Sequence, residues 1–461
     1  MLLAGIGASA QEGATQGGGA GDGLSAAVRE VVKPIRSIDP DDTDFADLAV
    51  IGEAIEEARV VVLGEATVGD GASHLMKSRL VKYLHGELGF TVLVYEASLG
   101  DCHLMNIALE RGDDPRDVAA VGLTEYWAQS GHASEAIRYA WASFFDPDPL
   151  RVAGFGWRSA SAAPNRGWAR ELIDFVRELD PEPWDRELRA RFLTLPQRAT
   201  EAVNNGDDIG MIDAWQDWAE LQERFTGLRE PLIAQHGEAA YGFWARAVED
   251  RLAQFEEALD PRPPLLDVDL KSRNADAGKM GENLVWLATE AFPDEKLIVW
   301  TRTELVLGDP GSIETRPEPG ITQGYEPPVL AWREALGGEL IVLGITGGSG
   351  VSGEVGVPSQ PMPDLGDESV EALLDKTGLP FAFVDFEGVA DGHPLAEKRV
   401  SDIAGLSRTM RGMGFINENE VRATADWTRQ LDGLIYLRRM FPATGNGSIP
   451  TGAILRTGEA E

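Results

Sequence analysis

The chain has 461 residues, of which 43% are hydrophobic and 25% are charged, proportions typical of globular proteins. It carries 76 Asp and Glu against 41 Lys and Arg, so its formal net charge at pH 7 is −35. Such a surface repels nucleic acid and anionic membranes, and we expect neither as a partner. The sequence has no apolar run of ~18 residues that could span a membrane, and its single cysteine, Cys102, excludes an intrachain disulfide.

The first 24 residues are expected to lie outside the fold. "MLLAGIGASAQEG" has a short apolar run and an Ala-Ser-Ala that could precede a cleavage site, but no positively charged start. "GATQGGGAGDG" has the composition of a linker. Residues 1–24 are therefore predicted to be a disordered tail or a signal-peptide remnant, and residues 25–461 the folded domain. We expect a cytoplasmic protein, with secretion as the alternative if the true start lies upstream of Met1.

Helical patterns alternate with short apolar runs along much of the chain. The helical patterns cover residues 24–35, 44–58, 73–88 and 279–292. The apolar runs are rich in Val and Ile and nearly continuous, which is typical of strands covered on both faces. They cover residues 60–65, 91–98, 151–157, 296–303, 339–347, 381–388 and 433–439. This alternation predicts an α/β fold with a central, mainly parallel sheet flanked by helices.

Residues from about 165 to 260 contain no strand pattern. Apolar residues recur there at spacings of three and four, which predicts an all-helical insertion in the sheet domain. The Pro/Gly-rich stretches 307–328 and 348–366 are predicted to be long loops. "GITGGSGVSG" at 344–353 is also interpreted as a loop, because it lacks the Lys of a phosphate-binding loop and no helix pattern follows it at once.

Polar residues at strand ends are the candidates for a site, because ligands of open α/β sheets bind beyond the carboxyl ends of strands. Glu65 ends the first predicted strand and Glu96 the second; Asp385 and Glu387 follow a later one. Strands joined by one helix are commonly neighbours, so Glu65 and Glu96 are expected to lie close, one as an ionised base and the other holding a proton. The ordinary alternative is that a strand-end Glu caps a helix or pairs with an Arg.

Further candidate site residues are charged or aromatic side chains, of which Arg302 and Glu304 follow the fourth predicted strand and His74 lies about one turn from Lys77 in the helix after Glu65. They are Arg302, Lys77, Glu304, His74 and Trp300. The ordinary interpretation of His74 is helix packing, and that of Trp300 is the core. The six histidines do not fall at metal-ligand spacing, so we expect no metal. No Walker loop or placed dinucleotide fingerprint is visible, and we expect no cofactor.

The sequence resembles the erythromycin esterase family over nearly its whole length. "LGEATVG" and "RLVKYLHGELGFTVLVYEAS" are similar to the family's Gly-Glu-Ala-Thr-His-Gly turn, helix and Glu-bearing strand. Further similar segments follow in the family's order: "YWAQSGHASEAIRYAWASF", "RVAGFGW", "KMGENLVWL", "KLIVWTRTEL" and "LDGLIYLRR". The resemblance implies the family's fold and metal-independent hydrolysis of an ester or macrolide-type lactone by carboxylate-activated water, with a role in the response to antibiotics.

The chain departs from the family at the implied site. Val68 stands where the family has the histidine of its first turn. Arg302 and Leu305 align with two further histidines, and Gly156 with an aspartate. Lys77 stands at the position of a family arginine. Val68 and Leu305 cannot transfer protons, so the chain is predicted to be a divergent member that lacks the family's site histidines.

Three functions stay open on this basis. The first is a hydrolase in which Glu65 is the base and Arg302 and Lys77 stabilise the anion. The second is a lyase or transferase that uses Glu65 for proton abstraction. The third is a catalytically inactive homologue that binds a small apolar ligand. In each case the partner is a small molecule, and no feature fixes an oligomeric state. Replacing Glu65 by Gln is expected to abolish activity with little loss of stability.

Overall fold

The computed structural model describes residues 26–55, 57–159, 167–177, 186–259, 270–316, 322–405 and 422–457. The predicted tail, residues 1–24, and residues 317–321 of the predicted loop 307–328 lie outside these ranges. No helix within them is long and apolar enough to cross a membrane.

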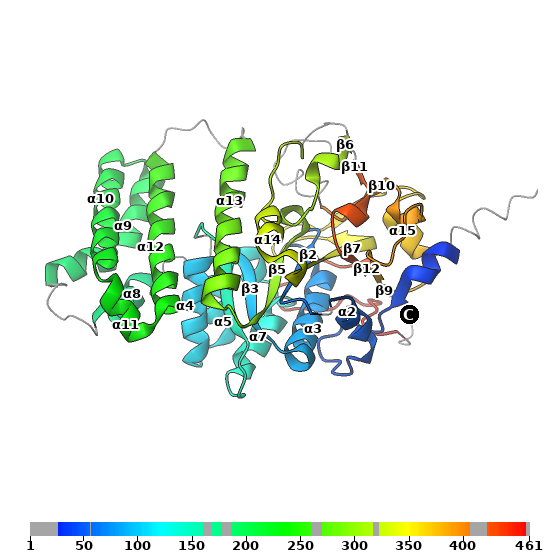
Figure 1. The fold of residues 1–461 in the computed structure, drawn as a ribbon, viewed down its shortest axis with the longest axis horizontal. Helices are drawn as coiled ribbons and strands as arrows, with labels where there is room; N and C mark the ends of the chain where they lie inside the picture. The colour runs from blue at the N-terminus through cyan, green and yellow to red at the C-terminus, as the bar shows by residue number, and fades with distance from the viewer. Residues whose placement is uncertain are drawn as a thin grey trace, which may run out of the picture.

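A central sheet organises the fold (Figure 1). Its strands follow the order β1-β9-β12-β7-β2-β5-β3-β4, and a short β8 pairs with β7. Their bounds are β1 (Val32–Pro34), β2 (Val60–Glu65), β3 (Phe90–Ser98), β4 (Arg151–Gly156), β5 (Lys296–Arg302), β7 (Leu340–Ser352), β8 (Gln360–Pro361), β9 (Phe381–Asp385) and β12 (Gly433–Met440). All neighbours from β12 to β4 are parallel, whereas β9 runs antiparallel to both β1 and β12. The predicted α/β fold with a mainly parallel sheet is confirmed.

Helices cover both faces of this sheet because its strands are apolar on both sides. In β2, Val60 and Val62 point into one core and Val61 and Leu63 into the other. The second core is covered by α2 (Ala49–Ile55), α3 (Gly71–Leu88), α5 (Pro115–Gly122), α6 (Glu125–Ala128) and α7 (Ser134–Ser143). The first is covered by α13 (Leu270–Trp286), α14 (Val329–Leu336) and α15 (Val370–Asp375). α4 (Leu99–Glu110) follows β3 directly.

The predicted all-helical insertion is present and projects to one side of the sheet (Figure 1). It contains α8 (Trp168–Arg177), α9 (Arg186–Asn205), α10 (Asp208–Gly227), α11 (Arg229–His236) and α12 (Glu238–Leu259). These helices bury their own core around Trp168 and Trp218. A second, small antiparallel sheet joins β10 (Arg399–Ser401), β11 (Arg422–Ala425) and β6 (Glu314–Arg316).

Two local predictions were wrong. Residues 24–35 were expected to be one helix, but a helix over 26–31 gives way to β1, which pairs with β9. The glycine run at 344–353 was expected to be a loop, but β7 continues through it to Ser352. A Cβ at Gly347 would lie 2.3 Å from Cγ of Met440 on β12. The glycines therefore leave room for side chains of the neighbouring strand β12. A pattern based on strand propensity does not reveal this close packing.

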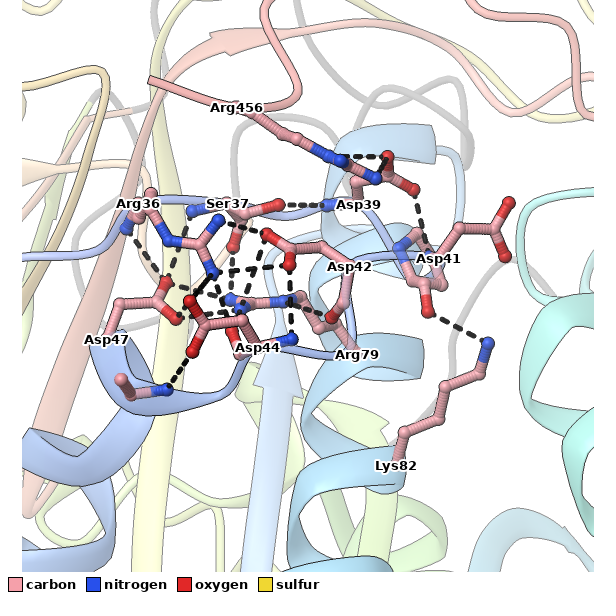
Figure 2. Close-up of polar contacts among 12 residues, drawn as sticks. Arg36, Ser37, Asp39, Asp41, Asp42, Asp44, Asp47, Arg79, Lys82 and Arg456 are labelled. Atoms are coloured by element: carbon pink, nitrogen blue, oxygen red, sulfur yellow. Dashed lines mark hydrogen bonds and ion pairs between the residues drawn. The ribbon is translucent and has the colours of Figure 1, made fainter. Parts of the chain in front are cut away.

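A loop of residues 36–47 is tied to α3 by the fully buried Arg79 (Figure 2). The Arg79 guanidinium donates to both carboxylate oxygens of Asp47, at 2.9 and 2.7 Å, and to the carbonyl of Ser37 at 2.7 Å. Arg456 pairs with Asp39 in the same loop. The network fixes the position of α3, which also carries two of the candidate site residues.

Candidate active site

Glu65 lies at the carboxyl end of β2 and is fully buried. Because Leu63 points to the α3 face, Glu65, two residues on, points there as well. Its Oε2 lies 2.9 Å from Nζ of Lys77 and 3.5 Å from Nε2 of His74, two residues one turn apart on α3. Its Oε1 accepts a hydrogen bond of 2.9 Å from Nε1 of Trp127 on α6.

The charge of Glu65 is stabilised inside the protein by its partners. Burial alone would raise the pKa of Glu65, but the charge of Lys77, followed by His74, outweighs burial and lowers the pKa to about 2. Lys77 also lies 4.9 Å from the ring centroid of Trp300. Glu65, His74, Lys77 and Trp300 are each 0% exposed. We call these four residues the sealed layer, since no substrate reaches them in this conformation.

Two residues of the sealed layer, Glu65 and His74, form with Ser130 an arrangement that resembles a catalytic triad. Nδ1 of His74 lies 3.1 Å from Oγ of Ser130, so a serine, a histidine and Glu65 follow one another in space. Ser130 is only 1% exposed, however, and its hydroxyl accepts the backbone N–H of Ala133. The group therefore acts as internal packing. Ser130 could not be predicted as a neighbour of His74, because nothing in the sequence pattern distinguishes it from other serines.

A second set of candidates lies where β3 and β5 end, and it is partly exposed. Nε and Nη2 of Arg302 donate to Oε1 of Glu96 at 2.9 and 2.5 Å, and Nη1 donates to Oε1 of Glu304 at 2.6 Å. The side chains of Arg302 and Glu304 are 29% and 14% exposed, and that of Glu96 is 6% exposed. We call Glu96, Arg302 and Glu304 the open group.

Electrostatics keeps Arg302 charged. Burial lowers the pKa of its guanidinium, but the charges of Glu96 and Glu304 outweigh this effect and hold the pKa well above its usual value. Glu96 is also fixed by hydrogen bonds. Its Oε2 accepts one from the hydroxyl of Thr301 at 2.7 Å and one from the backbone N–H of Arg302 at 3.0 Å. Both oxygens of Glu96 are thus occupied by two donors each.

The expectation that the first two predicted strands are neighbours was wrong. β5 lies between β2 and β3, and each of the two carboxylates pairs with its own cation, Glu65 with Lys77 and Glu96 with Arg302. β9 is antiparallel to β12, which places Asp385 and Glu387 at the opposite edge of the sheet. Strand order in space, which the individual strand patterns do not contain, decides both outcomes.

Three of the positions that depart from the family, Val68, Leu305 and Gly156, are apolar or closely packed. Val68 and Leu305 are 9% and 7% exposed and belong to the two cores of the sheet. A Cβ at Gly156 would lie 2.9 Å from the backbone of Ala97, so an aspartate does not fit there without movement of β3.

Two tyrosines near the open group were missed from the sequence. Burial and then the charge of Glu96 raise the pKa of Tyr126 to about 12. Burial and the charge of Glu304 also raise the pKa of Tyr325. Both phenols therefore stay protonated at neutral pH and can donate hydrogen bonds. Among the described residues, no three His, Cys, Asp or Glu side chains are arranged to hold a metal ion.

Comparisons with known proteins identify the family and the fold. A family model described as erythromycin esterase matches residues 85–440. YbfO of Bacillus subtilis (strain 168), which is named provisionally as a hydrolase, is 23% identical over 437 residues, or 88% of this chain and 89% of its own. A crystal structure of a Bacillus cereus protein has a TM-score of 0.71 at 17% identity and covers 92% of this chain and 98% of that one. A mutant of the erythromycin esterase EreC in its open conformation has a TM-score of 0.62 at 13% identity, covering 91% and 100%. These structures share the fold described above.

Proposed function

The chain belongs to the erythromycin esterase family, and from that premise we propose that it is a hydrolase of an ester or lactone that works through the open group. In this proposal Arg302 binds the carbonyl oxygen of the substrate and Glu304 activates the attacking water. Glu96 orients Arg302, and the sealed layer of Glu65, Lys77, His74 and Trp300 supports the strand ends from beneath.

The observation that carries the proposal is an arginine whose guanidinium is fixed by two carboxylates and whose side chain is 29% exposed. A guanidinium has five N–H groups. Three of those on Arg302 donate to Glu96 and Glu304, and the other two have no hydrogen-bond partner within the described ranges. A forked, permanently charged donor held in place is suited to the negative charge that develops on a carbonyl oxygen during ester hydrolysis.

Glu304 is the carboxylate best placed to accept a proton from water. Glu65 is 0% exposed, and both oxygens of Glu96 are occupied. Glu304 uses one oxygen for Arg302, and its other oxygen has no partner in the part of the chain that the structure describes. Its place on the turn Thr303–Leu305, directly after β5, sets it beside the fork of Arg302.

The substrate in this proposal is a small, largely apolar ester or lactone of the macrolide type. The phenols of Tyr126 and Tyr325 lie close enough to the open group to feel its charges, and they are candidate hydrogen-bond donors to the substrate. A role in the response to antibiotics follows only if a macrolide is the substrate. The proposed reaction uses the side chains of Arg302, Glu304 and Glu96 and needs no metal ion or cofactor.

A second candidate is ligand binding without catalysis. It is favoured by the apolar Val68 and Leu305 and by the closure of Glu65, the base expected from the sequence. A lyase or transferase reaction, the third possibility, would use the same carboxylate and arginine for proton abstraction.

The test is hydrolysis of a panel of esters and lactones that includes a macrolide. Glu304→Gln should lower kcat by ~10² or more, as expected for loss of a positioned base, and Arg302→Lys should lower it by ~10 to 10². Glu314→Gln is the matched control. Glu314 lies on β6, is exposed and pairs with Lys398, so its replacement should leave activity unchanged.

Each outcome separates the candidates. Full activity of Glu304→Gln would exclude this residue as the base. Products without the added mass of water would indicate elimination. Absence of turnover by the wild type on the whole panel would favour the binding role, and ligand screening would follow.

A further inference from the structure

Thr301 connects the sealed layer with the open group. It lies on β5 directly before Arg302 and is 0% exposed. Its carbonyl oxygen accepts a hydrogen bond of 2.9 Å from Nζ of Lys77, and its hydroxyl donates to Oε2 of Glu96 at 2.7 Å. Thr301 thus hydrogen-bonds both to Lys77 of the sealed layer and to Glu96 of the open group.

The hydroxyl matters because of how Arg302 holds Glu96. Nε and Nη2 of the guanidinium both donate to the same oxygen, Oε1, rather than one to each oxygen. A contact through a single oxygen leaves the carboxylate free to turn about that oxygen, unlike the side-by-side pair that Arg commonly forms. The other oxygen, Oε2, is fixed by the Thr301 hydroxyl and the backbone N–H of Arg302.

We propose that Thr301 is a positioning residue for the Arg302 guanidinium. By fixing the plane of Glu96 it fixes the direction of the guanidinium, and with it the two N–H groups assigned to the substrate. This inference rests on the proposed function, since it assigns Thr301 a role in presenting Arg302 to the carbonyl oxygen.

Two substitutions at Thr301 separate positioning from packing. Thr301→Val keeps the branched shape and removes the hydroxyl, and it should lower kcat about tenfold, the effect of one hydrogen bond to a charged group, with little change in KM. Thr301→Ser keeps the hydroxyl and removes a buried methyl, so it should retain most of kcat while lowering the urea midpoint. If Thr301 merely packed, activity would follow stability, and the serine variant would be at least as impaired as the valine variant.

Thr303→Val is the matched control. Thr303 is also 0% exposed, but its hydroxyl has no hydrogen-bond partner in the described structure. Removing it should change neither kcat nor the reactivity of Arg302. An equal loss of activity in Thr303→Val and Thr301→Val would overturn the assignment.

A second measurement is independent of turnover. Phenylglyoxal modifies guanidinium groups, and its rate at Arg302 can be followed by the mass of the peptide that contains this residue. Thr301→Val should raise that rate several-fold, while Thr301→Ser and Thr303→Val should leave it near that of the wild type. Unchanged reactivity in Thr301→Val would refute the inference even if the protein hydrolyses esters. Raised reactivity without turnover in any variant would refute the proposed hydrolysis and keep the positioning role.

Discussion

Replacing Glu65 by Gln leaves Lys77, whose pKa burial already lowers, as a buried cation without its nearest counter-charge. The pKa of Glu65 falls from 4.5 to about 2 on folding. Because a change of one in pKa corresponds to about 1.4 kcal/mol, this decrease corresponds to about 3 kcal/mol of stabilisation. The figure agrees with the ~3–5 kcal/mol that removal of one partner from a buried ion pair costs. The sequence predicted little loss of stability for Glu65→Gln, whereas the structure predicts a substantial loss. The sequence does not reveal that the side chains of Glu65 and Lys77 are both 0% exposed.

A double-mutant cycle measures this coupling. We expect Glu65→Gln and Lys77→Met each to lower the free energy of unfolding in urea by about 3 kcal/mol. The double variant should lose less than the sum by on the order of 2 kcal/mol, because it removes both charges. Additive losses, or a loss below about 0.5 kcal/mol in either single variant, would refute the reasoning.

Three other properties follow from the same structure. Because the folded pKa of Glu65 is depressed, its stabilisation is full above pH about 4.5 and is lost as the pH falls to about 2; urea midpoints should drop across this window in the wild type, and less in Glu65→Gln. Gly347→Val should destabilise by ~1–3 kcal/mol through overpacking against Met440, whereas Gly338→Ala, where an added Cβ meets nothing within 4 Å, should be neutral in the same urea titration. Burial raises the pKa of the Cys102 thiol, which is 0% exposed, so a disulfide reagent should label it only in denaturant; rapid labelling of the folded protein would contradict its burial.

Much of the fold was predictable because the strands are apolar on both faces. Continuous runs such as Val60–Leu63 distinguish a buried parallel strand from a half-exposed one. Strand order was not predictable, since the insertion of β5 between β2 and β3 depends on contacts distant in sequence. The strand character of the β7 glycines was not predictable, because these glycines make room for side chains of β12, such as Met440.

The sequence predicted several residues of the candidate site, but it did not predict how their side chains contact one another. A strand end followed by a helix identified Glu65 and Glu96, and proximity to the end of β5 identified Arg302 and Glu304. Nothing local in the sequence shows that Lys77 closes over Glu65, or that Thr301 donates to Glu96. Exposure and hydrogen bonding, which decide the proposed roles, are properties of the packed protein.

The central place of β2 has a consequence for biosynthesis. Its two partners, β5 and β7, are made only when residues 296–302 and 340–352 leave the ribosome. Until then a nascent chain carries an apolar strand with both edges unpaired, a state prone to association with other chains. Pairing between segments so far apart in sequence also makes folding slow. Expression of this protein should therefore depend on chaperones that shield the emerging strand.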